Sequence, residues 1–421
     1  MPIKITESMR IQFRRDGMLI LKQVVPPDRL ESVRASTNTV VDRARAADPI
    51  WDTNPIPRAQ IGSFCDRNTR SSFAFALHAN TLGVSAQILD CPVNTIGVNM
   101  ISVLCNPQFE PHPPSPSGQP WGTDPRNWHR DVRPDHDGPL SELIADQEAN
   151  GPGYVQWNIA LLDEAILNVV PGSHRRLNSE LEMRQLNLDG GTMRPLDGSI
   201  AVDLKAGDGV VYNPMLLHWG SRYTSHQKRR TLLFSYRSFG RMLPYPIDTF
   251  LSEDVCRLLD GGQRDLLDRS LDLYRQEYVR IEVLFGAVIA GDRGRFQANL
   301  QKLHPASEGR LTCLIILTRM ARQLEERRRS DAKPKAGPVS LSIALQSELL
   351  AKLSAADLDR LWARFERFDA LLRADEATHV RGFLGKPTKY HFERLPAGVT
   401  LDRAVAAIMD EADSDGPTGA G

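Results

Sequence analysis

A histidine and a carboxylate lie two residues apart in the segment Trp128-His129-Arg130-Asp131, and a second histidine, His218, closes a later strand-like run. On an extended strand, residues i and i+2 point to the same face, so the side chains of His129 and Asp131 would converge. Two histidines and one carboxylate on one face of a metal ion, with the other positions open, form the ligand set of non-heme Fe(II) oxygenases. The sequence therefore predicts a metal centre built from His129, Asp131 and His218.

A candidate carboxylate-binding residue, Arg229, follows His218 by eleven residues. A dicarboxylate co-substrate at such a centre needs a cation at its far end, and arginine binds carboxylates through a bidentate fork. Because side chains alternate along a strand, only one of Arg229 and its neighbour Arg230 would face inward. The spacing from His218 favours Arg229, and the ordinary alternative for an Arg-Arg pair is a solvated sheet edge.

Other residues of the chain offer similar ligand atoms. Residues 135–137 (Asp-His-Asp) follow Pro134 and precede Gly138-Pro139, which indicates a loop. His226 is an alternative to His218 as the distant ligand, but Arg229 and Arg230 follow it too closely for a strand to lie between the ligand and the arginines. We expect His174, in a Pro-Gly-Ser-His turn, to hydrogen-bond within its loop, and His112 to lie in a solvent-exposed loop. Trp128 and Trp219 flank two ligands and are expected to pack around the site.

Short strand-like runs joined by turns must position these residues. The runs cover residues 17–21, 154–162, 200–204, 210–219 and 230–236. Short strands joined by Gly- and Pro-containing turns are typical of a β-sandwich or jelly roll, and not of a parallel α/β sheet. Residues 106–127 are dense in Pro, Gly, Ser and Asn and predict a long loop leading into the strand of His129. Residues 241–250 are a second candidate lid.

The pattern changes to helical spacing after about residue 250. We predict an oxygenase-like jelly-roll domain over residues 1–250 and a helical C-terminal extension over residues 251–421, with a linker at 331–339. The simplest role for the extension is a helical cap packed on the β core. It could instead form a lid or a homo-oligomer interface.

The composition narrows the class of partner and the compartment. Lys+Arg and Asp+Glu both number 52 in 421 residues, so the formal net charge gives no support for nucleic acid or an anionic membrane as the main partner. The five cysteines are scattered without a C-x-x-C pair, which argues against a zinc site or a disulfide framework and favours a cytoplasmic setting. We expect no signal peptide and no membrane span.

Several longer segments carry these features in order. They are FRRDGMLILKQVVPPDRLESVRA, WHRD, QWNIALLDEAILNVVPGSHRR, KAGDGVVYNPMLLHWGS and the region around Arg229. Together they resemble the phytanoyl-CoA dioxygenase family of Fe(II)/2-oxoglutarate-dependent oxygenases, over about residues 10–240. The resemblance implies a double-stranded β-helix, which is a distorted, cupin-like jelly roll.

The resemblance also implies roles for individual residues. His129, Asp131 and His218 match the iron ligands, and Arg229 matches the residue that holds the C5 carboxylate of 2-oxoglutarate. Gln156 and Asn158 are candidates for contacts with this co-substrate. Family members often have Glu-Asn-Gly before the Pro-Gly-Ser-His turn, whereas this chain has DEAILN at residues 163–168.

By resemblance, the reaction uses Fe(II), 2-oxoglutarate and O2, releases succinate and CO2, and acts on a small molecule. Related halogenases replace the carboxylate ligand with a small residue, so Asp131 favours hydroxylation, desaturation or ring closure.

Other classes of function compete with this one. The tripeptide His-Arg-Asp also occurs in the catalytic loop of kinases, but a kinase would need Asn at position 136, where this chain has His, as well as a glycine-rich loop and D-F-G. Two further hypotheses are a cupin-type isomerase or lyase that uses another metal, and a non-catalytic binding protein on the same fold. Arg229 argues against the cupin-type enzyme, because an enzyme that does not use 2-oxoglutarate needs no arginine to bind a dicarboxylate.

Overall fold

The computed structural model describes residues 2–48, 57–105, 128–133, 137–188, 191, 194–220, 228–241, 253–330, 341–378, 382–383 and 388–410. Several sequence predictions concern residues outside these ranges. They are the 106–127 loop with His112, Asp135 and His136, His226, residues 242–250 of the second candidate lid, and the 331–339 linker.

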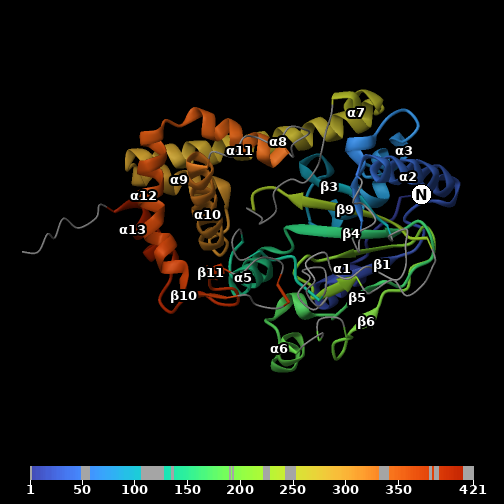
Figure 1. The fold of residues 1–421 in the computed structure, drawn as a ribbon, viewed down its shortest axis with the longest axis horizontal. Coiled ribbons are helices and arrows are strands. Elements are labelled where there is room, and N and C mark those ends of the chain that lie inside the picture. Colours follow the sequence, from blue (N-terminus) through green and yellow to red (C-terminus); the bar gives the residue numbers. More distant parts are fainter. Residues whose placement is uncertain are drawn as a thin grey trace, which may run out of the picture.

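An antiparallel six-stranded sheet forms the centre of the fold, in the order β1-β7-β4-β9-β3-β2 (Figure 1). Its strands are β1 (Met18–Leu21), β2 (Arg58–Gln60), β3 (Ile96–Cys105), β4 (Tyr154–Ala160), β7 (Gly209–Tyr212) and β9 (Arg230–Ser238). Along β4, Val155 and Trp157 belong to the main apolar core, and the intervening Gln156 and Asn158 point to the other face. That second face is the interior of the two-sheet core.

A smaller sheet, in the order β6-β5-β8, faces the large one. Its strands are β5 (Leu167–Val169), β6 (Ile200–Ala201) and β8 (His218–Gly220). An apolar cluster that includes Val169, Leu204, Val210 and Tyr212 packs between the sheets. The expected fold class is borne out at this level, as a mainly antiparallel core with flanking helices, consistent with a jelly roll.

Helices cover the outer face of the large sheet and one side of the small one. They are α1 (Glu7–Asp16), α2 (Pro27–Ala47), α3 (Arg70–Phe75), α4 (Val84–Ile88), α5 (Leu140–Asn150) and α6 (Glu180–Asn187). Side chains of α2, α3 and α4 join Trp157 in the main core. Helix α6 begins with a capping box in which Ser179 and Glu182 satisfy each other's backbone N–H groups.

The single strand expected over residues 210–219 is wrong. The chain leaves the large sheet after Tyr212 and enters the small sheet at His218, so it crosses between the two sheets. Pro214 cannot donate a ladder hydrogen bond, and the Asn213 side chain accepts from the backbone N–H of Met215 at 2.9 Å, which closes a tight turn. His218 therefore opens a strand instead of ending one.

The C-terminal part is mainly helical, as predicted. Its elements are α7 (Glu253–Leu258), α8 (Gly261–Ala290), α9 (Arg293–Leu303), α10 (Arg310–Arg329), α11 (Leu341–Lys352), α12 (Ala355–Leu372), the pair β10 (Arg373–Thr378) and β11 (Thr388–Tyr390), and α13 (Leu401–Met409). The sequence did not indicate the β10–β11 pair. Helices α8, α9, α10, α12 and α13 enclose a second apolar core.

Helix α8 connects the two cores, and in Figure 1 it runs from the sheets to the C-terminal helices. Its Leu267 belongs to the main core, whereas its Ile281 belongs to the second. Arg237 of β9 forms a bidentate ion pair with Glu277 of α8, with N–O distances of 2.9 and 2.7 Å, and both side chains are largely buried. The division into two domains near residue 250 stays a prediction. Within the described ranges, none of the helices is long and apolar enough to span a bilayer.

Candidate metal centre

The structure brings His129, Asp131 and His218 together at the edge of the small sheet. His129 pairs with His218 as an antiparallel bridge, with both N–H···O distances at 2.9 Å. His129 Nε2 lies 3.5 Å from Asp131 Oδ1, and His218 Nε2 lies 3.7 Å from Asp131 Oδ2. All three ligand atoms fall within 4.8 Å of one another, and no other such group occurs among the described residues. The side chains of His129 and Asp131 therefore lie on one face, and His218 approaches them from a distant part of the sequence, as expected.

Hydrogen bonds and burial set the protonation of these groups. His218 Nδ1 contacts the carbonyl oxygen of Leu216 at 2.7 Å; since a carbonyl only accepts, Nδ1 carries the proton and Nε2 presents its lone pair to the site. Burial, together with the nearby His129, lowers the pKa of His218 to about 4, so the ring is neutral at pH 7. Burial disfavours the ionised form of Asp131, but the two histidines and Gln156 more than offset this and lower its pKa to about 2. The donor set at neutral pH is thus one carboxylate and at least one neutral imidazole.

Residues of the large sheet face this group from the other side of the interior. The side-chain amide of Gln156 donates to Asp131 Oδ2, so Gln156 orients the Asp131 carboxylate. Asn158, two residues along β4, is buried, and its Oδ1 has no hydrogen-bond partner within the described part of the chain. The Tyr212 ring lies 5.2 Å from the His218 ring, centroid to centroid.

Arg229 lies farther along the interior, where β9 begins. Its Nε donates to Thr231 Oγ1 at 2.8 Å and to Glu164 Oε2 at 3.1 Å, and the Thr231 hydroxyl donates to the same carboxylate at 2.6 Å. The ion pair is deeply buried, with side-chain exposures of 3% for Arg229 and 5% for Glu164. Arg230 points the other way and donates to Asn38 Oδ1 of α2 at 2.9 Å.

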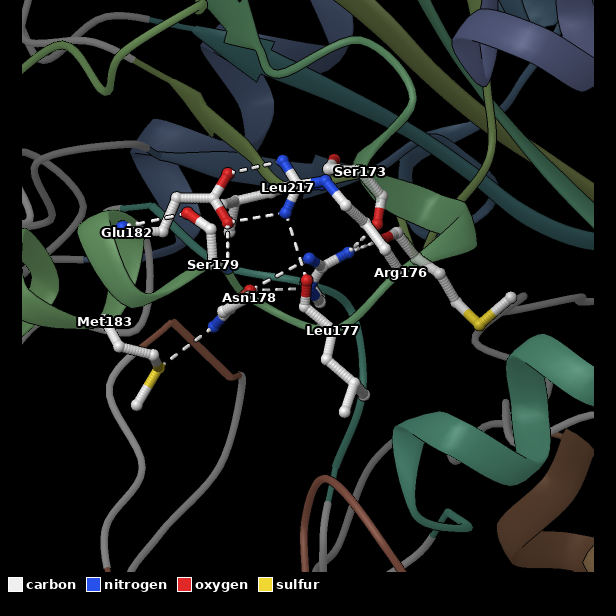
Figure 2. A network of polar contacts seen from close by, with 10 residues as sticks. Ser173, Arg176, Leu177, Asn178, Ser179, Glu182, Met183 and Leu217 are labelled. Atoms are coloured by element: carbon white, nitrogen blue, oxygen red, sulfur yellow. Dashed lines mark hydrogen bonds and ion pairs between the residues drawn. The ribbon is translucent and has the colours of Figure 1, made fainter.

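The Pro-Gly-Ser-His turn contacts both segments that carry the candidate ligands, next to His218 and at Arg130. Ser173 Oγ accepts from the backbone N–H of Leu217 at 2.8 Å, one residue before His218. Its carbonyl accepts from Arg130 Nη1 at 2.6 Å, and Asn178 Oδ1 accepts from Arg130 Nε and Nη2 at 3.0 and 2.8 Å. Figure 2 shows the polar contacts around Ser173 and Asn178. The turn therefore fixes the ligand strands relative to each other.

Other residues singled out in the sequence have structural contacts. His174 Nε2 lies 3.2 Å from the carbonyl oxygen of Arg14, which ties the turn to α1 as a loop-stabilising hydrogen bond. Trp128 and Trp219 pack against each other at 5.7 Å between centroids, in an apolar cluster on the outer side of the small sheet. Asp137 accepts from the backbone N–H of Arg133.

Comparison with known proteins identifies the family. The sequence profile described as Phytanoyl-CoA dioxygenase (PhyH) matches residues 13–231, more than half of the chain. The chain belongs to this family. No curated protein matches it in sequence.

Solved structures of other proteins are also similar to this phytanoyl-CoA dioxygenase family member. One is HygX from Streptomyces hygroscopicus with nickel and 2-oxoglutarate bound, at 16% identity and a TM-score of 0.41, covering 60% of this chain and 94% of HygX. Another is the epimerase SnoN in complex with Fe3+, alpha ketoglutarate and nogalamycin RO, at 14% identity and a TM-score of 0.38, covering 56% of this chain and 84% of SnoN. A third is AviO1 from Streptomyces viridochromogenes Tue57, at 17% identity and a TM-score of 0.37, covering 56% and 96%.

The sequence did not single out two polar partners of Arg229, which are Thr231 and Glu164. Thr231 could have been found, because it lies two residues after Arg229 on one strand and so shares its face. Glu164 belongs to the segment that departs from the family pattern, but its contact with Arg229 spans 65 residues and has no local signal.

Proposed function

We propose that this chain is an Fe(II)- and 2-oxoglutarate-dependent oxygenase that hydroxylates a small molecule and releases succinate and CO2. The observation that carries the proposal is the convergence of His129, Asp131 and His218 in a member of the phytanoyl-CoA dioxygenase family. The double-stranded β-helix fold, a cytoplasmic location and a homo-oligomer through the C-terminal helices remain parts of this proposal.

The chemistry of the three donors fits an Fe(II) ion. Imidazole nitrogen and carboxylate oxygen suit this metal, and three ligands on one side leave positions for co-substrates. Donors about 2.1 Å from an ion and at right angles to each other lie about 3 Å apart. The 3.5 and 3.7 Å separations join the two histidine nitrogens to different Asp131 oxygens, and small side-chain rotations would bring one oxygen and both nitrogens onto one ion. When bound, iron supplies the oxidative chemistry, and the protein positions the reactants.

The interior between the sheets supplies contacts for 2-oxoglutarate. Arg229 would be the clamp that holds its C5 carboxylate, since guanidinium binds carboxylates through paired N–H donors. Asn158 is a further candidate, because a buried amide oxygen without a partner is costly and a polar ligand would satisfy it. Gln156 already contacts Asp131, so its contact with the co-substrate stays a prediction.

The Glu164–Arg229 ion pair bears on how strongly the co-substrate binds. A dicarboxylate would meet a guanidinium whose charge is already balanced by Glu164. Binding of 2-oxoglutarate would then place two carboxylates near one cation. We infer that Glu164 weakens 2-oxoglutarate binding and orients Arg229 by accepting from its Nε.

The presence of Asp131 supports hydroxylation over halogenation, because this carboxylate would bind the metal where a halide would otherwise bind. The hydroxyl group would go to a free small molecule, since the zero formal net charge gives no general attraction for a polyanionic partner. The specific substrate would be selected by side chains around the metal centre.

Turnover of 2-oxoglutarate tests the proposal. Purified protein with 2-oxoglutarate and O2 is expected to form succinate only when Fe(II) is added. His129→Ala and His218→Ala should abolish succinate formation. His78→Ala, which removes a half-buried histidine outside the centre, should not. Ordinary turnover in Asp131→Ala would argue against the ligand assignment, and succinate formed without any metal would overturn the proposal.

A further inference from the structure

The C-terminal part of the chain contacts the backbone between two of the ligands. Arg130, which lies between His129 and Asp131, donates its backbone N–H to the carbonyl oxygen of Gly382 at 3.0 Å. Arg130 and Phe383 form a parallel β-bridge, next to the antiparallel bridge of His129 with His218. Residues 382–383 therefore extend the small sheet by one short segment, on the side where an exposed edge would otherwise lie.

Arg130 itself is a buried tie between segments. Its side chain points away from the candidate metal ligands and is fully buried. Besides its bonds to Asn178 and Ser173, Nη1 donates to the carbonyl oxygen of Met215 at 2.6 Å. These acceptors are all neutral oxygens, so the guanidinium is held in place mainly by directional hydrogen bonds and not by a direct ion pair. A shift of Arg130 would move His129 and Asp131 with it.

Gly382 fits its place closely. Its φ is +83°, a conformation that side chains disfavour. An added Cβ would lie 2.7 Å from Leu186 Cδ1 and 3.4 Å from Asn178 Nδ2. Leu186 is fully buried among the outer apolar residues of the small sheet, and Asn178 is the acceptor for Arg130. A side chain at position 382 would therefore displace Leu186 and lie in contact with Asn178, the residue that accepts from Arg130.

Phe383 fixes this segment from the other side. It is buried in a cluster with Val132, which directly follows Asp131, and with Met215. Its ring also lies 5.9 Å from the Phe392 ring, centroid to centroid, within the C-terminal region. The segment is thus packed against the residues that flank the ligands and is anchored in the C-terminal part.

We propose that the Gly382–Phe383 segment is a positioning element of the metal centre, so that docking of the C-terminal part and metal binding are linked. This inference rests on the proposed function, because it assumes that the three side chains bind a metal ion. Linkage is reciprocal: if the docked segment favours the metal-bound geometry, the metal ion stabilises the docked segment to the same extent. The extension then contributes to the reaction site instead of being a separate appendage.

The test compares two glycine variants by their affinity for Mn(II) alone. Gly398 is a matched control: its φ of +79° is similar, it also lies in the C-terminal part, and an added Cβ would meet only the far end of the Arg403 side chain, at 3.1 Å. Changes around metal ligands typically weaken metal binding about 10- to 100-fold. We expect this loss in Gly382→Ala, with Gly398→Ala within about twofold of wild type. Mn(II) affinity is measured by calorimetry and electron paramagnetic resonance, on variants whose circular dichroism matches wild type.

Hydrogen exchange of the wild-type protein gives a second readout, which holds even if Gly382→Ala fails to fold. Mn(II) should slow exchange in peptides that contain Arg130 and in peptides that contain Phe383, and it should leave a peptide around Gly398 unchanged. Equal Mn(II) affinities in the two variants, or unchanged exchange at Arg130 and Phe383, would overturn the inference alone. A wild-type protein that does not bind Mn(II) would overturn the proposed function and this inference with it.

Discussion

Replacing Glu164 with Gln should tighten the binding of 2-oxoglutarate. The change keeps the shape of the side chain and an oxygen that can accept from Arg229 and Thr231, but it removes the negative charge 3.1 Å from Arg229 Nε. Arg229 is then a buried cation without this counter-charge, and the C5 carboxylate of the co-substrate can supply it.

The electrostatic gain can be estimated from the buried geometry. Two carboxylates around one guanidinium lie about 5 Å apart, and at an effective dielectric constant near 20 they repel each other by about 3 kcal/mol. Both side chains of the pair are 5% exposed or less, so solvent screens this repulsion little. A gain of about 3 kcal/mol corresponds to about 100-fold in the dissociation constant, and relaxation reduces it, so we expect a 10- to 100-fold fall.

The assay is calorimetric titration of 2-oxoglutarate into Mn(II)-loaded protein without O2. Asp163→Asn is the matched control, because it removes the neighbouring acid, whose side chain is 61% exposed. Without 2-oxoglutarate, Glu164→Gln should also lower the free energy of unfolding, since breaking a buried ion pair costs about 3–5 kcal/mol. An unchanged or weaker affinity for 2-oxoglutarate in Glu164→Gln would refute the reasoning and assign Glu164 a purely orienting role.

Three further predictions concern the clamp, a buried histidine and the contact between the two cores. Arg229→Ala should raise the KM for 2-oxoglutarate about 10- to 100-fold and Arg230→Ala should not, because only Arg229 faces the interior; the reverse result in succinate assays would move the clamp to Arg230. Burial lowers the pKa of His174 to about 4, so protons bind the unfolded chain first and stability falls as pH drops from about 6.5 towards 4. Urea unfolding should show His174→Gln losing about 2 kcal/mol less than wild type between pH 7 and pH 5, and parallel losses would contradict this. Glu277→Ala should lower the free energy of unfolding by about 3–5 kcal/mol, because Arg237 stays buried without its partner; a loss below about 1 kcal/mol in urea would show that the pair is not buried in solution.

Local rules were sufficient to predict which neighbouring side chains share a face. The i, i+2 spacing of His129 and Asp131 defines a shared face, and the alternation of Arg229 and Arg230 separates the inward from the outward arginine. The turn at Pro214 was missed because apolar residues continue on both sides of it. The sequence pattern there is that of one strand, although proline interrupts the hydrogen-bond ladder.

The remaining features of the site depend on contacts between distant segments. Glu164 reaches Arg229 because the end of β4 pairs with the start of β9, where Ala160 lies opposite Thr231, and no periodicity encodes that approach. Gly382 lies in a part of the chain with no resemblance to the family, and its contact with Arg130 depends on how the C-terminal region docks. Such pairings follow from the topology, which a single sequence specifies only through the complete fold.

A crystal structure of the protein with Mn(II) and 2-oxoglutarate, prepared without O2, tests the central claim most directly. We predict one ion bound by His129, Asp131 and His218 and chelated by the 2-oxo acid, with the C5 carboxylate at Arg229. An ion bound elsewhere, or a 2-oxoglutarate molecule that does not reach both the ion and Arg229, would contradict it.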